Sequence, residues 1–167
     1  MMNGNYRHEN VIRWSSRLNI NDLFDLKKLF IPMNIPGQHW FFIIVDFTEA
    51  EIGAYDSNPV KTSRIEYLYN VQRYLNDEWE ENKQKRQENR NRPRWKISDV
   101  DVSRNEVQGN GFDCGVFTCM FIYFSVMGWP FVFHQEHIDK KCRPHLALSM
   151  LRQNLASLMD LHAVSEV

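Results

Sequence analysis

The chain carries no excess of charge and no long apolar run, and both absences narrow its function. Its 20 Lys and Arg residues nearly balance 21 Asp and Glu residues, which leaves a formal net charge of -1. Charge therefore provides no general attraction to nucleic acid or to an anionic membrane. The apolar run at 41–47 is too short for a membrane-spanning helix, which needs about 20 residues. The sequence predicts a protein that binds neither nucleic acid nor a membrane.

Cysteine is also scarce, and its positions argue against two kinds of chemistry. The three cysteines are Cys114, Cys119 and Cys142, and the first two are too far apart for a Cys-x-x-Cys redox pair. His134 and His137 could join Cys142 as zinc ligands, but no second cysteine pair completes such a site. We predict neither a metal nor another cofactor. With no secretory signal, three cysteines indicate a reducing compartment, the nucleus or the cytoplasm.

Length and patterning predict one compact, monomeric domain. A chain of 167 residues with 43% hydrophobic content can bury one sizeable core. Periodicity and turn residues predict helices at 23–30, 65–79, from 114 and from 144, and strands at 30–35, 41–47, 52–55 and 95–102. The charged stretch at 80–94 is predicted to be solvated.

A cysteine stands where turn residues give way to an apolar helical pattern. The stretch 109–111 reads Gly-Asn-Gly, and apolar residues then recur at helical spacing from Val116 to Phe124. Cys114 is therefore expected in the first turn of a buried helix, where free N–H groups and the helix dipole favour an anion such as a thiolate. A lone cysteine in an apolar helix is, however, more often a small hydrophobic residue.

Two further polar residues stand upstream at the ends of predicted strands. His39 precedes the apolar run at 41–47, and Asp56 follows the run at 52–55. A turn at 48–51 would join these runs into a hairpin, which predicts that both side chains lie at the same edge. An imidazole beside a carboxylate can accept a thiol proton, and the carboxylate stabilises the resulting imidazolium.

A fourth residue completes the candidate site. Gln108 lies in the loop before Cys114, where a side-chain amide can donate a hydrogen bond to a developing oxyanion together with the Cys114 backbone N–H. Each residue also has a plainer interpretation. His39 could be a surface histidine, Asp56 a turn residue and Gln108 a solvated side chain. Their joint occurrence in this order favours a catalytic interpretation.

These residues resemble the Ulp/SENP cysteine proteases, a family that processes SUMO and related ubiquitin-like proteins. The family shows a His-Trp pair opening a strand, an Asp-Ser pair ending the next, and a Gln-x-x-x-x-Asp-Cys-Gly segment entering a helix. The same motifs stand here in that order, at 39–40, 56–57 and 108–115. The stretches 28–35 and 133–138 are also similar to the family.

The resemblance implies a fold and a role for each residue. The fold would be α+β, a papain-like cysteine protease variant with a central, mainly antiparallel sheet and flanking helices. The implied catalytic residues are the general base His39, its orienting partner Asp56, the nucleophile Cys114 and the oxyanion donor Gln108. Trp40 would line a narrow groove for the substrate's C-terminal Gly-Gly, since only glycine lacks the Cβ that would clash there. Packing is the alternative role for Trp40.

The resemblance also implies a domain organisation and an activity. A polar leader at 1–10 would precede a catalytic domain at 11–160 that lacks the family's N-terminal part, and a tail would follow at 161–167. The activity would be that of a cysteine peptidase or isopeptidase that cleaves after the C-terminal Gly-Gly of SUMO or a related modifier. NEDD8 and ubiquitin remain open as modifiers. A weak or inactive module that binds a ubiquitin-like protein is the main alternative, and an effector-type acetyltransferase is a further one.

Overall fold

A computed structural model describes residues 6–11, 13–16, 20, 22–58, 63–82, 91–99 and 106–151. The strands are β1 (Lys28–Ile35), β2 (His39–Asp46), β3 (Glu51–Tyr55) and β4 (Lys96–Ser98). The α-helices are α1 (Arg13–Ser16), α2 (Ile65–Glu81), α3 (Cys114–Met127), α4 (Gln135–His137) and α5 (Arg143–Leu151). Two 3-10 turns, η1 (His8–Asn10) and η2 (Leu23–Asp25), and a π-helical segment, η4 (Ile138–Cys142), complete the described elements. The predicted tail at 161–167 lies outside the described residues.

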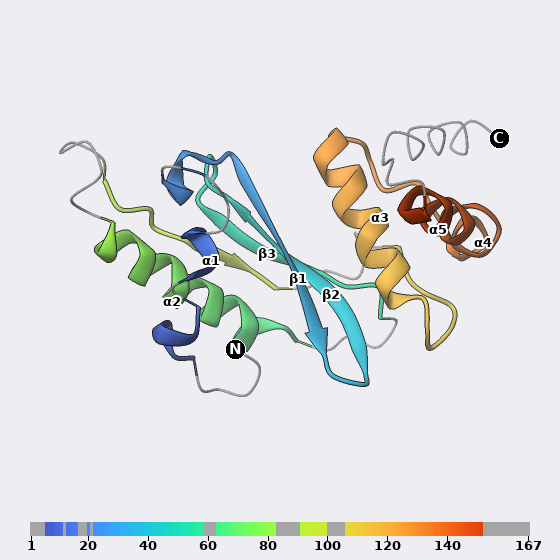
Figure 1. Ribbon diagram of the computed structural model, residues 1–167, viewed down its shortest axis with the longest axis horizontal. Coiled ribbons are helices and arrows are strands. Elements are labelled where there is room, and N and C mark those ends of the chain that lie inside the picture. The colour runs from blue at the N-terminus through green and yellow to red at the C-terminus, as the bar shows by residue number, and fades with distance from the viewer. Residues whose placement is uncertain are drawn as a thin grey trace. The chain divides into compact units, whose positions relative to one another are not determined.

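The four strands form one sheet in the order β1-β2-β3-β4. β1 and β2 run in opposite directions (Figure 1) and are joined by a turn in which Gln38 N donates to Ile35 O at 2.9 Å. Gly37 has a φ of 68° in that turn, a conformation that glycine adopts without a steric penalty. β4 is parallel to β3, with Ile52 opposite Ile97. The sheet is therefore mixed, and the α+β class predicted from the sequence is confirmed.

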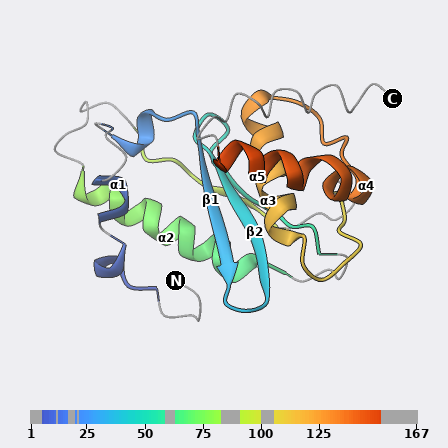
Figure 2. The same ribbon diagram turned by 45° about the vertical axis from the view of Figure 1, so that its right-hand side comes forward.

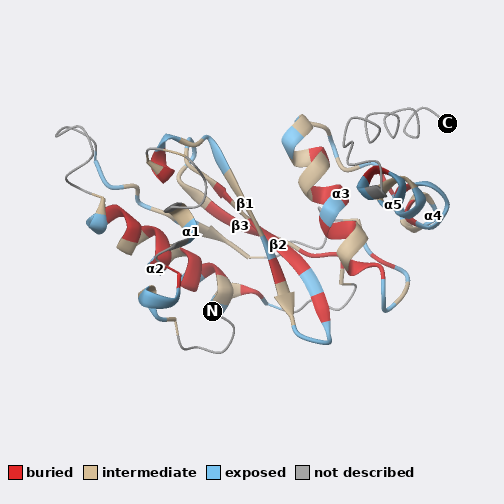
Figure 3. Ribbon diagram, viewed as in Figure 1, coloured by how far each residue is buried: buried red, intermediate tan, exposed pale blue. Residues whose placement is uncertain are grey.

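The described residues fall into two compact units. The first draws on the ranges 1–31, 43–54 and 63–100. Its helix α2 buries apolar side chains along its length (Figure 3), as the helical periodicity predicts. The start of α2 is held by the end of β4, because the Asp99 carboxylate accepts hydrogen bonds from Ser63 Oγ at 2.5 Å and Arg64 N at 2.8 Å. Edge-on rings fill this core, with Phe24 lying 4.9 Å from Trp79 between ring centroids.

The second unit draws on the ranges 32–42, 55–62 and 101–167. Helices α3, α4 and α5 lie side by side in both ribbon views (Figure 1 and Figure 2). The centre of the unit is an aromatic cluster around Phe121 of α3, whose ring centroid lies 5.0 Å from Phe131 and 5.2 Å from Phe133. Phe42 of β2 adds a ring at 6.3 Å from Phe121. Gly128 ends α3 with a φ of 71°, as expected of a glycine that terminates a helix.

Two predicted elements differ from the structure. The helix expected at 23–30 is wrong, because only the 3-10 turn η2 forms and β1 already begins at Lys28. The Asp22 side chain accepts from Phe24 N at 3.1 Å and caps the start of this turn, but the chain becomes extended at Leu26 and continues into β1. The strand predicted at 95–102 is observed only as β4, and residues 100–102 lie outside the described ranges. None of the described helices combines the length and the apolar character needed to cross a lipid bilayer.

Candidate functional site

His39 and Asp56 form a buried pair at one end of the hairpin. His39 is the first residue of β2, and Asp56 directly follows β3. Their side chains are 2.6 Å apart, from Nε2 to Oδ1, as the hairpin pattern predicts. The same Asp56 oxygen accepts from Asn58 N at 2.8 Å, which fixes the carboxylate. Because Nε2 faces Asp56, Nδ1 is the ring nitrogen left to accept a proton from a thiol.

Gln108 is tied to the residue that follows Asp56. Gln108 N donates to Ser57 O at 2.8 Å, and Ser57 Oγ donates to Gln108 Oε1 at 2.6 Å. The Gln108 amide nitrogen in turn donates to Asn110 O at 2.6 Å. One of the two N–H bonds of that amide is thus used within the loop, and the other is left to donate. The side chain is held rigidly beside the hairpin and is not a solvated glutamine.

Cys114 is the first residue of α3, as the sequence predicts, and its side chain is buried at 7% exposure. The free N–H groups and the positive end of the helix dipole lie at this position, and a helix start of this kind favours an anionic ligand. No hydrogen bond joins Cys114 to His39 within the described part of the chain. His39, Asp56, Gln108 and Cys114 nevertheless belong to the same compact unit.

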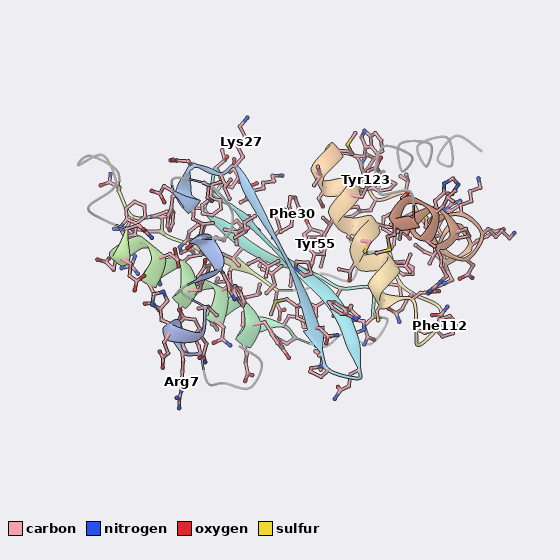
Figure 4. All side chains as sticks on the ribbon, viewed as in Figure 1. Arg7, Lys27, Phe30, Tyr55, Phe112 and Tyr123 are labelled. Atoms are coloured by element: carbon pink, nitrogen blue, oxygen red, sulfur yellow. The ribbon has the colours of Figure 1, made fainter. Side chains whose placement is uncertain are left out.

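Trp40 lies against the start of α3. A β-carbon at Gly115 would lie 3.8 Å from Cδ1 of Trp40, so the indole packs beside the residue that follows Cys114. The Trp40 side chain still keeps 43% of its surface exposed. An aromatic wall that is half open and adjacent to a buried thiol can line a groove for an extended peptide. Phe112 is a second exposed aromatic residue, and it projects from the loop before α3 (Figure 4).

The other two cysteines have different environments. Burial raises the pKa of the Cys142 thiol to about 11, so this group stays protonated at neutral pH. Cys119 lies on the same helix as Cys114 and is more exposed, although partial burial raises the pKa of its thiol as well. His134 pairs with Glu106 at 2.7 Å and does not form a metal-binding group with Cys142 among the described residues, where the grouped candidate ligands are His8, Glu78 and Glu81.

Sequence reasoning assigned no role to three polar residues that hold the candidate site together: Ser57, Asp113 and Gln135. Ser57 was visible as part of the Asp-Ser pair, but nothing in the pattern linked it to Gln108. Asp113 directly precedes Cys114, so its position at the start of a helix was a usable signal. Gln135 lies in the stretch 133–138 that resembles the family, but the pattern gave it no role, because a solvated glutamine next to charged residues has the same sequence pattern.

A family model matches nearly the whole chain. The model that describes the Ulp1 protease family, C-terminal catalytic domain, matches residues 3–167. The budding yeast protein named ubiquitin-like-specific protease 1, from Saccharomyces cerevisiae, is 30% identical over 115 residues, which cover 68% of this chain and 17% of the relative. The human protein named sentrin-specific protease 2 is 28% identical over 148 residues, which cover 89% of this chain and 23% of the relative.

A solved structure has a similar fold. The X-ray structure of the C-terminal Ulp1 protease domain in complex with Smt3, the yeast ortholog of SUMO, has a TM-score of 0.63 and 26% sequence identity. The similarity covers 81% of this chain and 57% of that chain. The chain thus spans a little over half of the solved domain and about a fifth of the length of these curated relatives.

Proposed function

This chain belongs to the Ulp1 protease family, and on that premise we propose that it is a cysteine peptidase of the SUMO-specific type. It would cleave after the C-terminal Gly-Gly of the modifier, in maturation or deconjugation. The observation that carries the proposal is the buried pair of His39 and Asp56, 2.6 Å apart, in one compact unit with a cysteine that begins a helix. This is the set of groups that thiol acyl transfer requires.

In the proposed mechanism, Nδ1 of His39 takes the proton from Cys114 Sγ, and Asp56 stabilises the imidazolium. The thiolate attacks the carbonyl carbon of the terminal glycine, and the oxyanion accepts hydrogen bonds from the Gln108 amide and the Cys114 backbone N–H. The C–N bond then breaks, and His39 gives its proton to the leaving lysine amine. His39 next takes a proton from water, whose oxygen attacks the thioester and releases the modifier carboxylate and the thiol.

Trp40 supports a substrate with glycine at the cleavage site. Its exposed indole lies beside Gly115 at the start of α3, so an extended peptide that reaches Cys114 passes along an aromatic face. A Cβ on the peptide would meet that face, and glycine has none. The complex of the yeast domain with Smt3 makes SUMO our first choice of modifier. We expect a monomer that acts in the nucleus or cytoplasm on SUMO conjugates, without nucleic acid or a membrane as a partner.

The proposal is tested with SUMO, NEDD8 and ubiquitin that carry a C-terminal vinyl sulfone, an electrophile that traps a reactive cysteine as a stable thioether. We expect the SUMO probe to add one modifier mass to the chain. The adduct should disappear in Cys114→Ala and persist in Cys119→Ala, a matched control because Cys119 lies on the same helix and is exposed. Mass spectrometry of the intact protein reads both results.

Three other outcomes would redirect the assignment. Labelling by the ubiquitin or NEDD8 probe alone would change the proposed modifier and leave the proposed cysteine peptidase mechanism unchanged. A chain that folds, binds SUMO and forms no adduct would be a binding module and not an enzyme. Transfer of an acetyl group from acetyl-coenzyme A to a protein lysine, without peptidase activity, would identify an acetyltransferase.

A further inference from the structure

The side chain of Gln135 binds both ends of the loop that joins the proposed oxyanion donor, Gln108, to the proposed nucleophile, Cys114. Gln135 is the first residue of α4. Its Oε1 accepts from Gly109 N at 2.7 Å, directly after Gln108. Its Nε2 donates to Asp113 Oδ2 at 2.6 Å, directly before Cys114. The loop therefore closes around an amide that comes from a distant part of the chain.

The Gln135 amide has little freedom to rotate away from this loop. Besides the bond to Asp113, Nε2 donates to Asp139 Oδ1 at 2.9 Å, so both amide hydrogens have acceptors. A β-carbon at Gly109 would lie 3.4 Å from Gln135 Cγ. This is an ordinary van der Waals distance, so the two residues pack against each other.

Asp113 explains why this restraint affects the start of α3. It occupies the position that caps the helix, yet its side chain makes no cap hydrogen bond, although aspartate there commonly accepts from the first-turn N–H groups. Its carboxylate instead accepts from Asn110, Gln135 and Arg143. Burial works to raise the pKa of Asp113, but these three donors outweigh it and hold the pKa below its usual range.

The Asp113 carboxylate is therefore committed to these three donors and makes no bond to the first-turn N–H groups of α3. Gln108 is fixed on the other side of the loop by Ser57. The spacing between the two proposed oxyanion donors therefore depends on a loop that Gln135 spans.

We propose that Gln135 is a positioning residue, which sets the separation of the Gln108 amide and the Cys114 backbone N–H by bridging Gly109 N and Asp113 Oδ2. It touches neither the substrate nor the reacting atoms. The inference rests on the proposed function in so far as those two donors serve an oxyanion. The bridge itself is a property of the chain and is tested separately from activity.

The test compares Gln135→Met, which keeps the length of the side chain and removes its hydrogen bonds, with Glu136→Met. Glu136 is the adjacent residue, and its exposed side chain pairs only with Lys140 among the described residues. Three quantities are measured on the full chain. The first is kcat with SUMO that carries a C-terminal amidomethylcoumarin, divided by the number of sites that react with the vinyl sulfone probe. The others are the rate at which iodoacetamide alkylates Cys114 and the rate of hydrogen exchange at the Gly109 amide.

We expect Gln135→Met to lower kcat per reactive site by about ten- to a hundredfold, the range that follows from misplacing an oxyanion donor without removing it. Alkylation should change less than threefold, because it needs the thiolate and no oxyanion donor. Exchange of the Gly109 amide should accelerate at least about tenfold, the size expected from losing a hydrogen bond worth roughly 1.4 kcal/mol. Glu136→Met should match the wild type in all three measurements.

An unchanged kcat per reactive site in Gln135→Met, with only the fraction of reactive protein reduced, would overturn the positioning role and leave a structural one. If the wild-type chain turns over no modifier substrate, the proposed function fails and the Gly109 exchange rate alone decides about the bridge. Faster exchange in Gln135→Met would then support the bridge, and unchanged exchange would refute it.

Discussion

The charge of Asp56 and its hydrogen-bond geometry can be separated by two substitutions, Asp56→Asn and Asp56→Ala. One oxygen, Oδ1, accepts both from His39 Nε2 at 2.6 Å and from Asn58 N at 2.8 Å. An asparagine can keep an oxygen at that position and so keep the imidazole oriented. An alanine loses the acceptor as well as the charge.

The size of each effect follows from this geometry. Two unit charges about 4 Å apart attract by about 4 kcal/mol at an effective dielectric constant of about 20. The Asp56→Asn variant keeps a neutral hydrogen bond, which retains about 1 kcal/mol of this stabilisation. The stabilisation of the imidazolium then falls by about 3 kcal/mol, which lowers the rate roughly a hundredfold. Loss of orientation in Asp56→Ala adds about a further hundredfold, for a total loss in rate of about ten thousandfold.

The assay is turnover of the SUMO coumarin substrate at saturating concentration, with the reactive sites counted by the vinyl sulfone probe. Thermal unfolding of both variants controls for folding, because Asp56 is 2% exposed and its replacement also removes a packed side chain. Equal losses of kcat in the two variants would contradict the reasoning, since charge and orientation would then not be separable. A fully active Asp56→Asn variant would show that the charge contributes nothing.

The remaining predictions concern the groove, an acid transition and the core. Trp40→Ala should raise KM at least about tenfold with a smaller change in kcat, because a large aromatic contact is lost without touching the reacting groups; steady-state kinetics check this. The depressed pKa of Asp113 stabilises the fold fully above the unfolded-state value of about 3.9, and this stabilisation is lost as the pH falls below it. Urea unfolding at pH 6 and pH 3 should therefore show a smaller loss in Asp113→Asn than in the wild type. Phe121→Ala should lower the free energy of unfolding by about 3–5 kcal/mol, and the exposed Val126→Ala by less than about 0.5 kcal/mol.

Much of the site could be predicted because its residues are marked by local patterns. His39 and Asp56 stand at the ends of strands, and a short turn between the strands is enough to bring them to one edge. Cys114 stands where glycine turns give way to helical periodicity, which depends only on residues within a few positions. The helix from 65 was predictable for the same reason, and it extends to Glu81 in the structure.

The parts of the fold that were not predicted depend on competing local signals or on pairing between distant residues. The stretch after Leu23 has apolar residues at helical spacing, but the chain becomes extended at Leu26 and enters β1 at Lys28, which limits the helix to one 3-10 turn. The parallel direction of β4 beside β3 was not predicted, although a helix between two strands favours a parallel pair. Strand direction is decided by the path of the chain between the strands, and α2 lies on that path.

The sequence by itself therefore determined which residues are candidates for the proposed chemistry, and which strand and helix ends they occupy. Only the tertiary structure decided how the loop before Cys114 is held. Gln108 bonds to Ser57 across 51 residues, and Gln135 bonds to Asp113 across 22 residues. A sequence does not show whether a glutamine, serine or aspartate side chain forms its hydrogen bonds with water or with other protein groups. These side chains meet their hydrogen-bond partners only after folding has brought distant parts of the chain together. The partners are therefore set by the tertiary structure.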